Sequence, residues 1–153
     1  MDQIYITRNT VFAATAGAKT ILKLITPTSF NIKIHRIKIS TDGVTATAVP
    51  ATLEYFTSDE TTAGTSVGTP VTTQVKGAAL AHGLTVGQNF SAEGTTYTIV
   101  DGIFLPQFMG VIIIDNPLGL EEQSPAGTAD SIGFRVNVSA NVNILMSIKW
   151  SRA

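Results

Sequence analysis

Two histidines are the only imidazole groups in the chain, so they are its first candidates for acid–base chemistry. His35 ends a segment of alternating polarity and His82 lies in a Gly/Ala-rich stretch, and neither has a carboxylate close to it in sequence. A general base needs a proton donor within hydrogen-bond reach and usually a third group that orients it. With no cysteine present, the nucleophile would have to be a hydroxyl, an amine or a carboxylate. The sequence therefore predicts structural or surface roles for both histidines.

The motifs for phosphate or metal binding are incomplete. The segment Gly-Ala-Lys-Thr at 17–20 ends like a phosphate-binding loop, but that motif requires glycine directly before the lysine, where Ala18 stands. The Asp-Gly pairs at 42–43 and 101–102 could begin calcium loops, yet the further acidic residues at alternate positions are missing. The adjacent glutamates at 121–122 lie in a Pro/Gly-rich loop, where solvation or contact with a basic group of a partner is expected. No catalytic, metal-binding or cofactor-binding residue is predicted, and the chain is not expected to be an enzyme.

The elements that position all of these groups are expected to be strands. The 153 residues include 22 Thr, 16 Ile and 12 Val, and β-branched side chains favour strands because their χ1 angle is already restricted. A chain of this length fits one domain, whose core needs neither a metal nor a disulfide.

Composition also limits the partners. Ten basic and eleven acidic residues, scattered along the sequence, give no net field that would attract a polyanion, which argues against nucleic-acid binding. The first residues do not resemble an export signal, and the longest apolar run, 111–114, is far shorter than the ~20 residues of a membrane helix. We expect a soluble protein without a nucleic-acid or membrane partner.

Alternation of apolar and polar residues predicts the individual strands. Residues 30–35 place Phe30, Ile32 and Ile34 on one face, and residues 37–40 resume the alternation with the opposite parity. One extra residue at His35-Arg36 would change the parity in this way, so we predict a β-bulge or a sharp bend there. Further strands are predicted at 51–57, 95–100, 102–105, 110–114, 132–138 and 142–150.

Four expectations concern how these strands are arranged and joined. The continuously apolar strand 110–114 should be covered on both faces, and the three residues 139–141 predict a hairpin between the last two strands. Residues 77–83, the only stretch of helix formers, predict one or two helical turns, and residues 116–130 predict a loop without regular structure. Eight or more short strands without βαβ alternation predict an all-β fold, a jelly-roll-like antiparallel sandwich or a small barrel.

The first 20 residues differ from the rest. Two short β-like pieces are followed by small side chains at 13–19, which cannot pack a core. We interpret residues 1–20 as an extended N-terminal arm that adds a strand to a neighbouring subunit, and residues 21–153 as the β-sandwich body. The alternative is an edge strand of the chain's own domain. In the arm interpretation the subunit or capsid interface includes Ile4, Tyr5, Ile6, Val11 and Phe12.

The core is expected to contain the apolar residues of the best-defined strands. Trp150, near the end of the last strand, is either a core residue or an interface anchor, with the core favoured. The remaining predicted core residues are Phe30, Ile32, Ile34, Phe134, Val136, Ile144 and Ile148.

Several short segments resemble the head decoration proteins, also called cement proteins, of tailed bacteriophages. The first is the strand–loop–strand junction at 40–50, and the resemblance continues in order over most of residues 20–150. One departure is Gly94, where members of this family tend to have proline after the glutamate. The further segments are Asn-Phe-Ser-Ala-Glu at 89–93, Gly-Val-Ile-Ile at 110–113, Asn-Pro-Leu-Gly at 116–119, Gly-Phe-Arg-Val-Asn at 133–137 and Asn-Val-Asn at 141–143.

This resemblance implies a structural virion protein that is made in the host cytoplasm and binds the outer surface of the matured capsid. Such a protein is usually a homotrimer at threefold or quasi-threefold positions, where it clamps neighbouring major capsid proteins and stabilises the expanded shell. The near-neutral, Thr-rich surface is compatible with copies packed on a shell. The alternative is a trimeric tail, fibre or receptor-binding virion module that recognises a cell-surface glycan.

Overall fold

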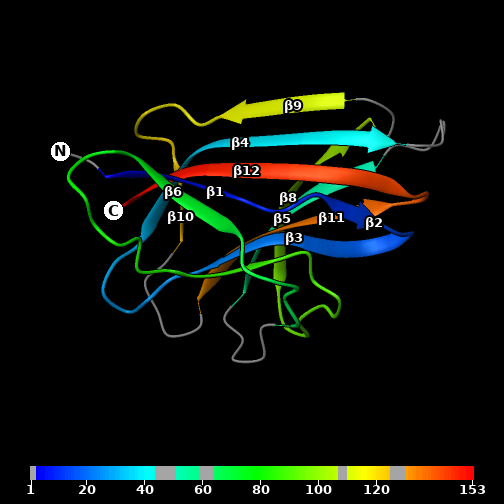
Figure 1. The fold of residues 1–153 in the computed structure, drawn as a ribbon, viewed down its shortest axis with the longest axis horizontal. Helices are drawn as coiled ribbons and strands as arrows, with labels where there is room; N and C mark the ends of the chain where they lie inside the picture. The colour runs from blue at the N-terminus through cyan, green and yellow to red at the C-terminus, as the bar shows by residue number, and fades with distance from the viewer. Residues whose placement is uncertain (1–2, 44–50, 59–63, 107–109, 125–129) are drawn as a thin grey trace.

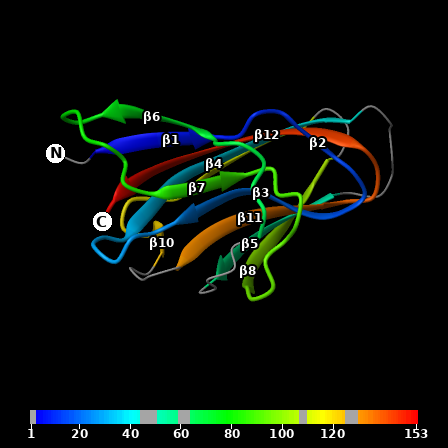
Figure 2. The same ribbon diagram turned by 60° about the horizontal axis from the view of Figure 1, so that its bottom comes forward.

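The computed structural model describes residues 3–43, 51–58, 64–106, 110–124 and 130–153, and the junction at 44–50 lies outside these ranges. It confirms an all-β protein. Twelve strands form two antiparallel sheets, which we call sheet A and sheet B (Figure 1). In Figure 2, β1, β6 and β12 of sheet A lie above β3, β11 and β5 of sheet B.

Sheet A has β4 and β12 at its centre, paired along the whole length of both strands. The outer edge of β4 is shared by two short strands, and the other edge of β12 is shared by two more. The members are β1 (Ile4–Arg8), β2 (Phe12–Ala14), β4 (Ile32–Gly43), β6 (Val71–Lys76), β9 (Gly110–Asp115), β10 (Glu122–Ser124) and β12 (Val142–Arg152).

Sheet B has the order β7-β3-β11-β5-β8, with β11 at its centre. Its strands are β3 (Gly17–Ile25), β5 (Ala51–Ser58), β7 (Thr85–Gln88), β8 (Thr98–Leu105) and β11 (Ser131–Val138). The inward-facing side chains of the two sheets form one core between them, with Trp150, Phe134 and Tyr5 as its largest members. Every predicted core residue is buried except Phe30, which is half-buried and packs against the core.

The predicted irregularity at His35-Arg36 is confirmed as a β-bulge. Lys149 of β12 pairs with Arg36 and Trp150 pairs with Ile34, so His35 is the extra residue. The bulge allows Ile34 and Ile37 to face the core together, although they are three residues apart.

The predicted hairpin between the last two strands is wrong. β11 belongs to sheet B and β12 to sheet A, so residues 139–141 cross between the sheets. Both strands turn their apolar side chains into the same core from opposite sides. Their alternation is therefore the same as that of a hairpin, although the two strands do not pair.

Three other local predictions also need correction. β9 is not covered on both faces, because Val111 and Ile113 are exposed. Residues 77–83 contain no helix: they form the connection from β6 to β7, and its backbone accepts a hydrogen bond from the Tyr5 hydroxyl at Leu80 O (2.9 Å). The loop predicted at 116–130 contains the short strand β10. The sequence patterns also missed β3, β6 and β7.

Gly133 marks the tightest packing in sheet B. A Cβ atom there would lie 2.1 Å from Cζ of Phe56, whose buried ring packs on Tyr97 with a centroid distance of 5.4 Å. We expect Gly133→Ala to lower the free energy of unfolding by about 1–3 kcal/mol, because the Phe56 ring must move. Gly102→Ala is the matched control, since its Cβ would meet Leu53 O at 3.5 Å, an ordinary contact. Urea denaturation measures both, and equal stability of the two variants would contradict this packing.

Candidate interaction surfaces

The five N-terminal residues predicted to form an interface lie within sheet A of the same chain. Tyr5 is only 1% exposed, because its ring stacks on Trp150 with a centroid distance of 4.6 Å. Ile4 and Ile6 are half-buried on the outer side of β1, and Phe12 is half-buried and packs against the core. Val11 is 64% exposed. In this single chain β1 pairs with β12 and β6 of sheet A, and among the five residues Val11 is the most open to a partner.

A buried network of hydrogen bonds connects the turn after β1 to the segment that follows β7. The side chain of Asn9 accepts a hydrogen bond from Met146 N (2.8 Å) and donates one to Asn89 Oδ1 (3.0 Å). Asn89 in turn donates to Thr10 O (3.1 Å) and has a left-handed backbone conformation, φ 49°, which asparagine tolerates better than most residues. Residues 9–10 are therefore held to two other parts of the chain.

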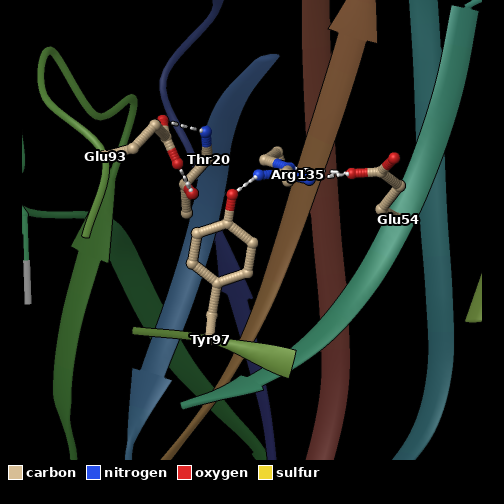
Figure 3. A network of polar contacts seen from close by, with 5 residues as sticks. All are labelled: Thr20, Glu54, Glu93, Tyr97 and Arg135. Carbon is tan, nitrogen blue, oxygen red and sulfur yellow. Dashed lines mark hydrogen bonds and ion pairs between the residues drawn. The ribbon is translucent and has the colours of Figure 1, made fainter. Parts of the chain in front are cut away.

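A second network crosses the outer face of sheet B, where Thr20, Arg135 and Glu54 are direct neighbours on β3, β11 and β5 (Figure 3). Arg135 donates to Glu54 Oε2 from Nε (2.7 Å) and Nη2 (2.5 Å), and to the Tyr97 hydroxyl. Glu93 accepts from Thr20 N (2.7 Å) and from the Thr20 hydroxyl. Burial alone would lower the pKa of Arg135, but the hydrogen bonds that it donates to Glu54 and Tyr97, with the charge of Glu54, outweigh this effect and raise the pKa. The network holds the segment before β8 against the sheet.

We expect Arg135→Ala to destabilise the protein by about 1–3 kcal/mol, because it leaves the half-buried Glu54 carboxylate without its charged partner. The double variant with Glu54→Ala should recover part of the loss. A denaturation cycle over the two single variants and the double variant measures the coupling. Additive losses would mean that the ion pair contributes no coupling energy to stability.

His35, Ser151 and Glu121 come together although they are far apart in sequence. The His35 Nε2 atom lies 2.8 Å from Ser151 Oγ, and its Nδ1 lies 3.9 Å from Glu121 Oε1. The order resembles a Ser-His-acid triad. However, Ser151 is only 3% exposed and the Glu121 contact is longer than a hydrogen bond. The arrangement therefore fits a structural contact between the β4 bulge, β12 and the segment before β10.

The environment of the Glu121 carboxyl can be tested by a pH titration. Hydrogen bonds from its own backbone N–H and from Gly119 N (2.8 Å), with the nearby charge of Lys33, lower the pKa of its carboxyl. Its stabilising effect is therefore present above the unfolded-state pKa and is lost as the pH falls through the lower folded-state value. An NMR titration should give a low midpoint for Glu121. Lys33→Gln should raise this midpoint, while Lys19→Gln should leave it unchanged. An ordinary midpoint in the unsubstituted protein would contradict the hydrogen bonds that the carboxylate accepts from the backbone.

The two flanks of the sandwich differ. On one flank, residues 77–84 join β6 at the edge of sheet A to β7 at the edge of sheet B, and Leu84 is buried in the core. On the other flank, β8 and β9 are edge strands, each with only one neighbour among the described residues. A cavity of about 230 Å³ lies between them, lined by Ile37, Leu53, Tyr55, Asp101, Gly102, Ile103, Ile114 and Phe134. We call this side the open flank.

Exposed apolar side chains gather along the open flank. Phe104 of β8 is 73% exposed, and its strand neighbours Ile99 and Val100 are about half exposed. Val111 and Ile113 of β9 are exposed to a similar degree. Apolar edge strands of this kind are sites at which another chain can pair.

The outer face of sheet A carries six of the ten basic residues. They lie on four strands at positions that point away from the core: Arg8, Lys33, Arg36, Lys38, Lys76 and Lys149. Among the described side chains, Asp42 and Asp115 bring negative charge to outward strand positions, and Glu121 lies near Lys33 at one end of the face. The basic residues are thus scattered along the chain but gathered in space. Alternation in the sequence indicated that Lys33, Lys38 and Lys149 face outward, but only the register of the strands brings all six residues to one face.

Two adjacent depressions lie on the outer face of sheet A. One, of about 210 Å³, is lined by Arg8, Lys38, Ser40, Leu145, Met146 and Ser147. The other, of about 500 Å³, shares Ser40 and Leu145 with it and continues to Val11, Asp42, Val111 and Asn143.

Within the described ranges, no group of three or more His, Cys, Asp or Glu side chains is arranged to hold a metal ion. In the same part of the chain, no helix has the length and hydrophobicity needed to cross a membrane. Compared with known proteins, the chain matches no family model and no curated protein.

Proposed function

We propose that this chain is a structural virion protein that binds the outer surface of the expanded phage capsid as a homotrimer. In this function it clamps neighbouring major capsid proteins and stabilises the shell. The observation that carries the proposal is the open flank, where two edge strands border a mostly apolar cavity and carry five exposed apolar side chains on their outer sides. A monomer in water gains nothing from such a surface, whereas an assembly buries it.

The strand order supports a jelly roll as the finer description of the sandwich. Eight strands taken in chain order, β1, β3, β4, β5, β8, β9, β11 and β12, pair first with last, second with seventh, third with sixth and fourth with fifth. This is the pairing of one long hairpin rolled into two sheets. Jelly rolls of eight strands occur in viral capsid and lectin domains.

The glycan-binding alternative has less support. Carbohydrate sites often use exposed Trp and Tyr rings, and Trp150 and Tyr5 are both buried in the core; Phe104 is exposed, but its ring has no polar group to bind a sugar hydroxyl. Tyr97 is partly exposed, but its hydroxyl is bound by Arg135. We therefore retain the glycan as an outcome of the experiment.

The proposed mechanism is mass action. A protein that binds only the expanded shell stabilises that state by the free energy of binding. A trimer engages three sites with one body, so the second and third contacts form at a high effective concentration.

Sedimentation velocity and co-sedimentation test the proposal. We expect a particle of three times the chain mass of 16.1 kDa, which pellets with empty expanded capsids of the phage and not with host cells. Phe104→Glu should weaken trimerisation or capsid binding, because it puts a charge on the open flank. Val67→Glu is the matched control, since Val67 is also exposed but lies beside β7, on the opposite flank. A monomer that does not pellet with capsids would overturn the proposal. Pelleting with cells alone would favour the glycan-binding function.

A further inference from the structure

Two cations at the centre of the outer face of sheet A, Arg8 and Lys38, have no acidic partner among the described residues. Arg36 is bound by Asp115 through Nε, and through Nη2 at 3.1 Å. By contrast, neither Arg8 nor Lys38 makes an ion pair or a side-chain hydrogen bond within the described part of the chain, and both are exposed. Lys149 acts on Asp115 only through its charge, without direct contact. The described side chains thus leave the positive charge of Arg8 and Lys38 without a direct counter-charge on this face.

The strand register places these cations around one point. Arg8 and Lys38 are the direct neighbours of Ser147, on β1 and β4, on either side of β12. Neighbouring strands lie about 4.8 Å apart, so the two backbones flank Ser147 at a separation of about 10 Å. The depression of about 210 Å³ lies between them, with the serine hydroxyls of Ser40 and Ser147 in its lining. A carboxylate entering this depression would meet two cations and the Ser147 hydroxyl, while the Ser40 hydroxyl donates to Leu145 O (3.4 Å).

We infer that the outer face of sheet A is a docking surface for an acidic segment of another protein, with Arg8, Ser147 and Lys38 at its centre. The inference rests on the proposed function, in which that protein belongs to the outer surface of the shell. Charge complementarity defines the occupant: it supplies the carboxylates that the face lacks. Apolar side chains of the occupant would contact Val111, Ile113 and Leu145, which are exposed beside the cations.

Two observations favour an acidic protein over a nucleic acid. Proteins that bind single strands stack bases on aromatic side chains, and none of the outward residues on β1, β4, β6, β9 and β12 is aromatic. A sugar-phosphate backbone also gains little from the exposed Val111 and Ile113, whereas protein interfaces combine apolar contacts with arginine.

Binding to immobilised poly-L-glutamate tests the surface directly. The unsubstituted protein should bind at low salt, and the double variant Arg8→Glu/Lys38→Glu should bind at least about tenfold more weakly, because both contacts become repulsive. Lys19→Glu, a charge reversal on sheet B, should bind like the unsubstituted protein. Circular dichroism spectra and urea denaturation verify that each variant is folded. Equal binding of the double variant and the Lys19 variant would overturn the inference, as would stronger binding of the unsubstituted protein to duplex DNA or to phosphatidylglycerol vesicles than to poly-L-glutamate.

Capsid co-sedimentation separates this inference from the proposed function. Loss of capsid binding by the double variant, with Lys19→Glu unaffected, would support both. Capsid binding that survives the double reversal would leave the function standing and overturn the docking surface. If the unsubstituted protein ignores capsids, the function fails, while the poly-L-glutamate comparison still decides whether the face binds acidic chains.

Discussion

Trp150→Ala is expected to lower the free energy of unfolding by about 3–5 kcal/mol. Trp150 is fully buried at the centre of the core, stacks on Tyr5 and donates a hydrogen bond from Nε1 to Thr7 Oγ1 (3.0 Å). Truncation would leave a large cavity in the core beside β1 and β12 and remove the stacking partner of Tyr5. A domain has only about 5–15 kcal/mol of stability in total, so this single change removes about a fifth of it or more.

Trp150→Phe is the matched control. It keeps an aromatic ring against Tyr5 but loses the hydrogen bond, and the Thr7 hydroxyl retains its contact with Thr72 Oγ1 (2.9 Å). We expect a loss of about 1–2 kcal/mol. Urea denaturation followed by far-UV circular dichroism is the suitable measurement, because both variants lack the chain's only tryptophan fluorophore. A loss below 1 kcal/mol for Trp150→Ala would mean that the β1–β12 interface is not formed as described.

The sequence could predict the faces of the strands with good precision. Alternation has a period of two, so the position of each apolar residue fixes which side of a strand faces the core. The same logic located the bulge, since a change of parity between Ile34 and Ile37 requires an extra residue, His35. It also identified Trp150 as a core residue.

Alternation does not identify the partner of a strand. β11 and β12 read as a hairpin because each turns one apolar face inward, yet they lie in opposite sheets. β9 looked like a central strand because Val111 and Ile113 continue its apolar run, but these side chains are exposed at an edge. An apolar residue that is kept for contact with another chain cannot be distinguished in sequence from one kept for the core.

The candidate interaction surfaces could not be predicted from the sequence for a related reason. Arg8, Lys38 and Lys149 lie on three strands that are distant in sequence, and only the register of β1, β12 and β4 brings them together. A count of charges along the chain gives ten basic and eleven acidic residues and shows no cluster of either sign. The asymmetry between the faces exists only in three dimensions.

The N-terminal segment provides the test with the largest expected effect. In the structure, β1 lies between β12 and β6, and β2 extends the same edge of β12. Removing residues 1–14 would expose one edge of β12 and uncover the ring of Trp150. It would also delete Asn9, which binds Met146 N and Asn89. We expect this variant to lose cooperative unfolding altogether and to bind hydrophobic dyes, as loosely packed chains do.

The outcome of this truncation distinguishes the two interpretations of the segment. An arm that folds only on a neighbouring subunit would leave residues 21–153 as a folded body with normal cooperativity. A segment that belongs to its own sandwich would leave a body that recovers its structure only when a peptide of residues 1–14 is added. Val11→Asp is the matched control within the segment, because Val11 is exposed and its replacement should change stability by less than about 0.5 kcal/mol. Cooperative unfolding of the truncated chain without the peptide would support the arm interpretation. It would mean that β1 can separate from β12 with little loss of stability in the rest of the sandwich.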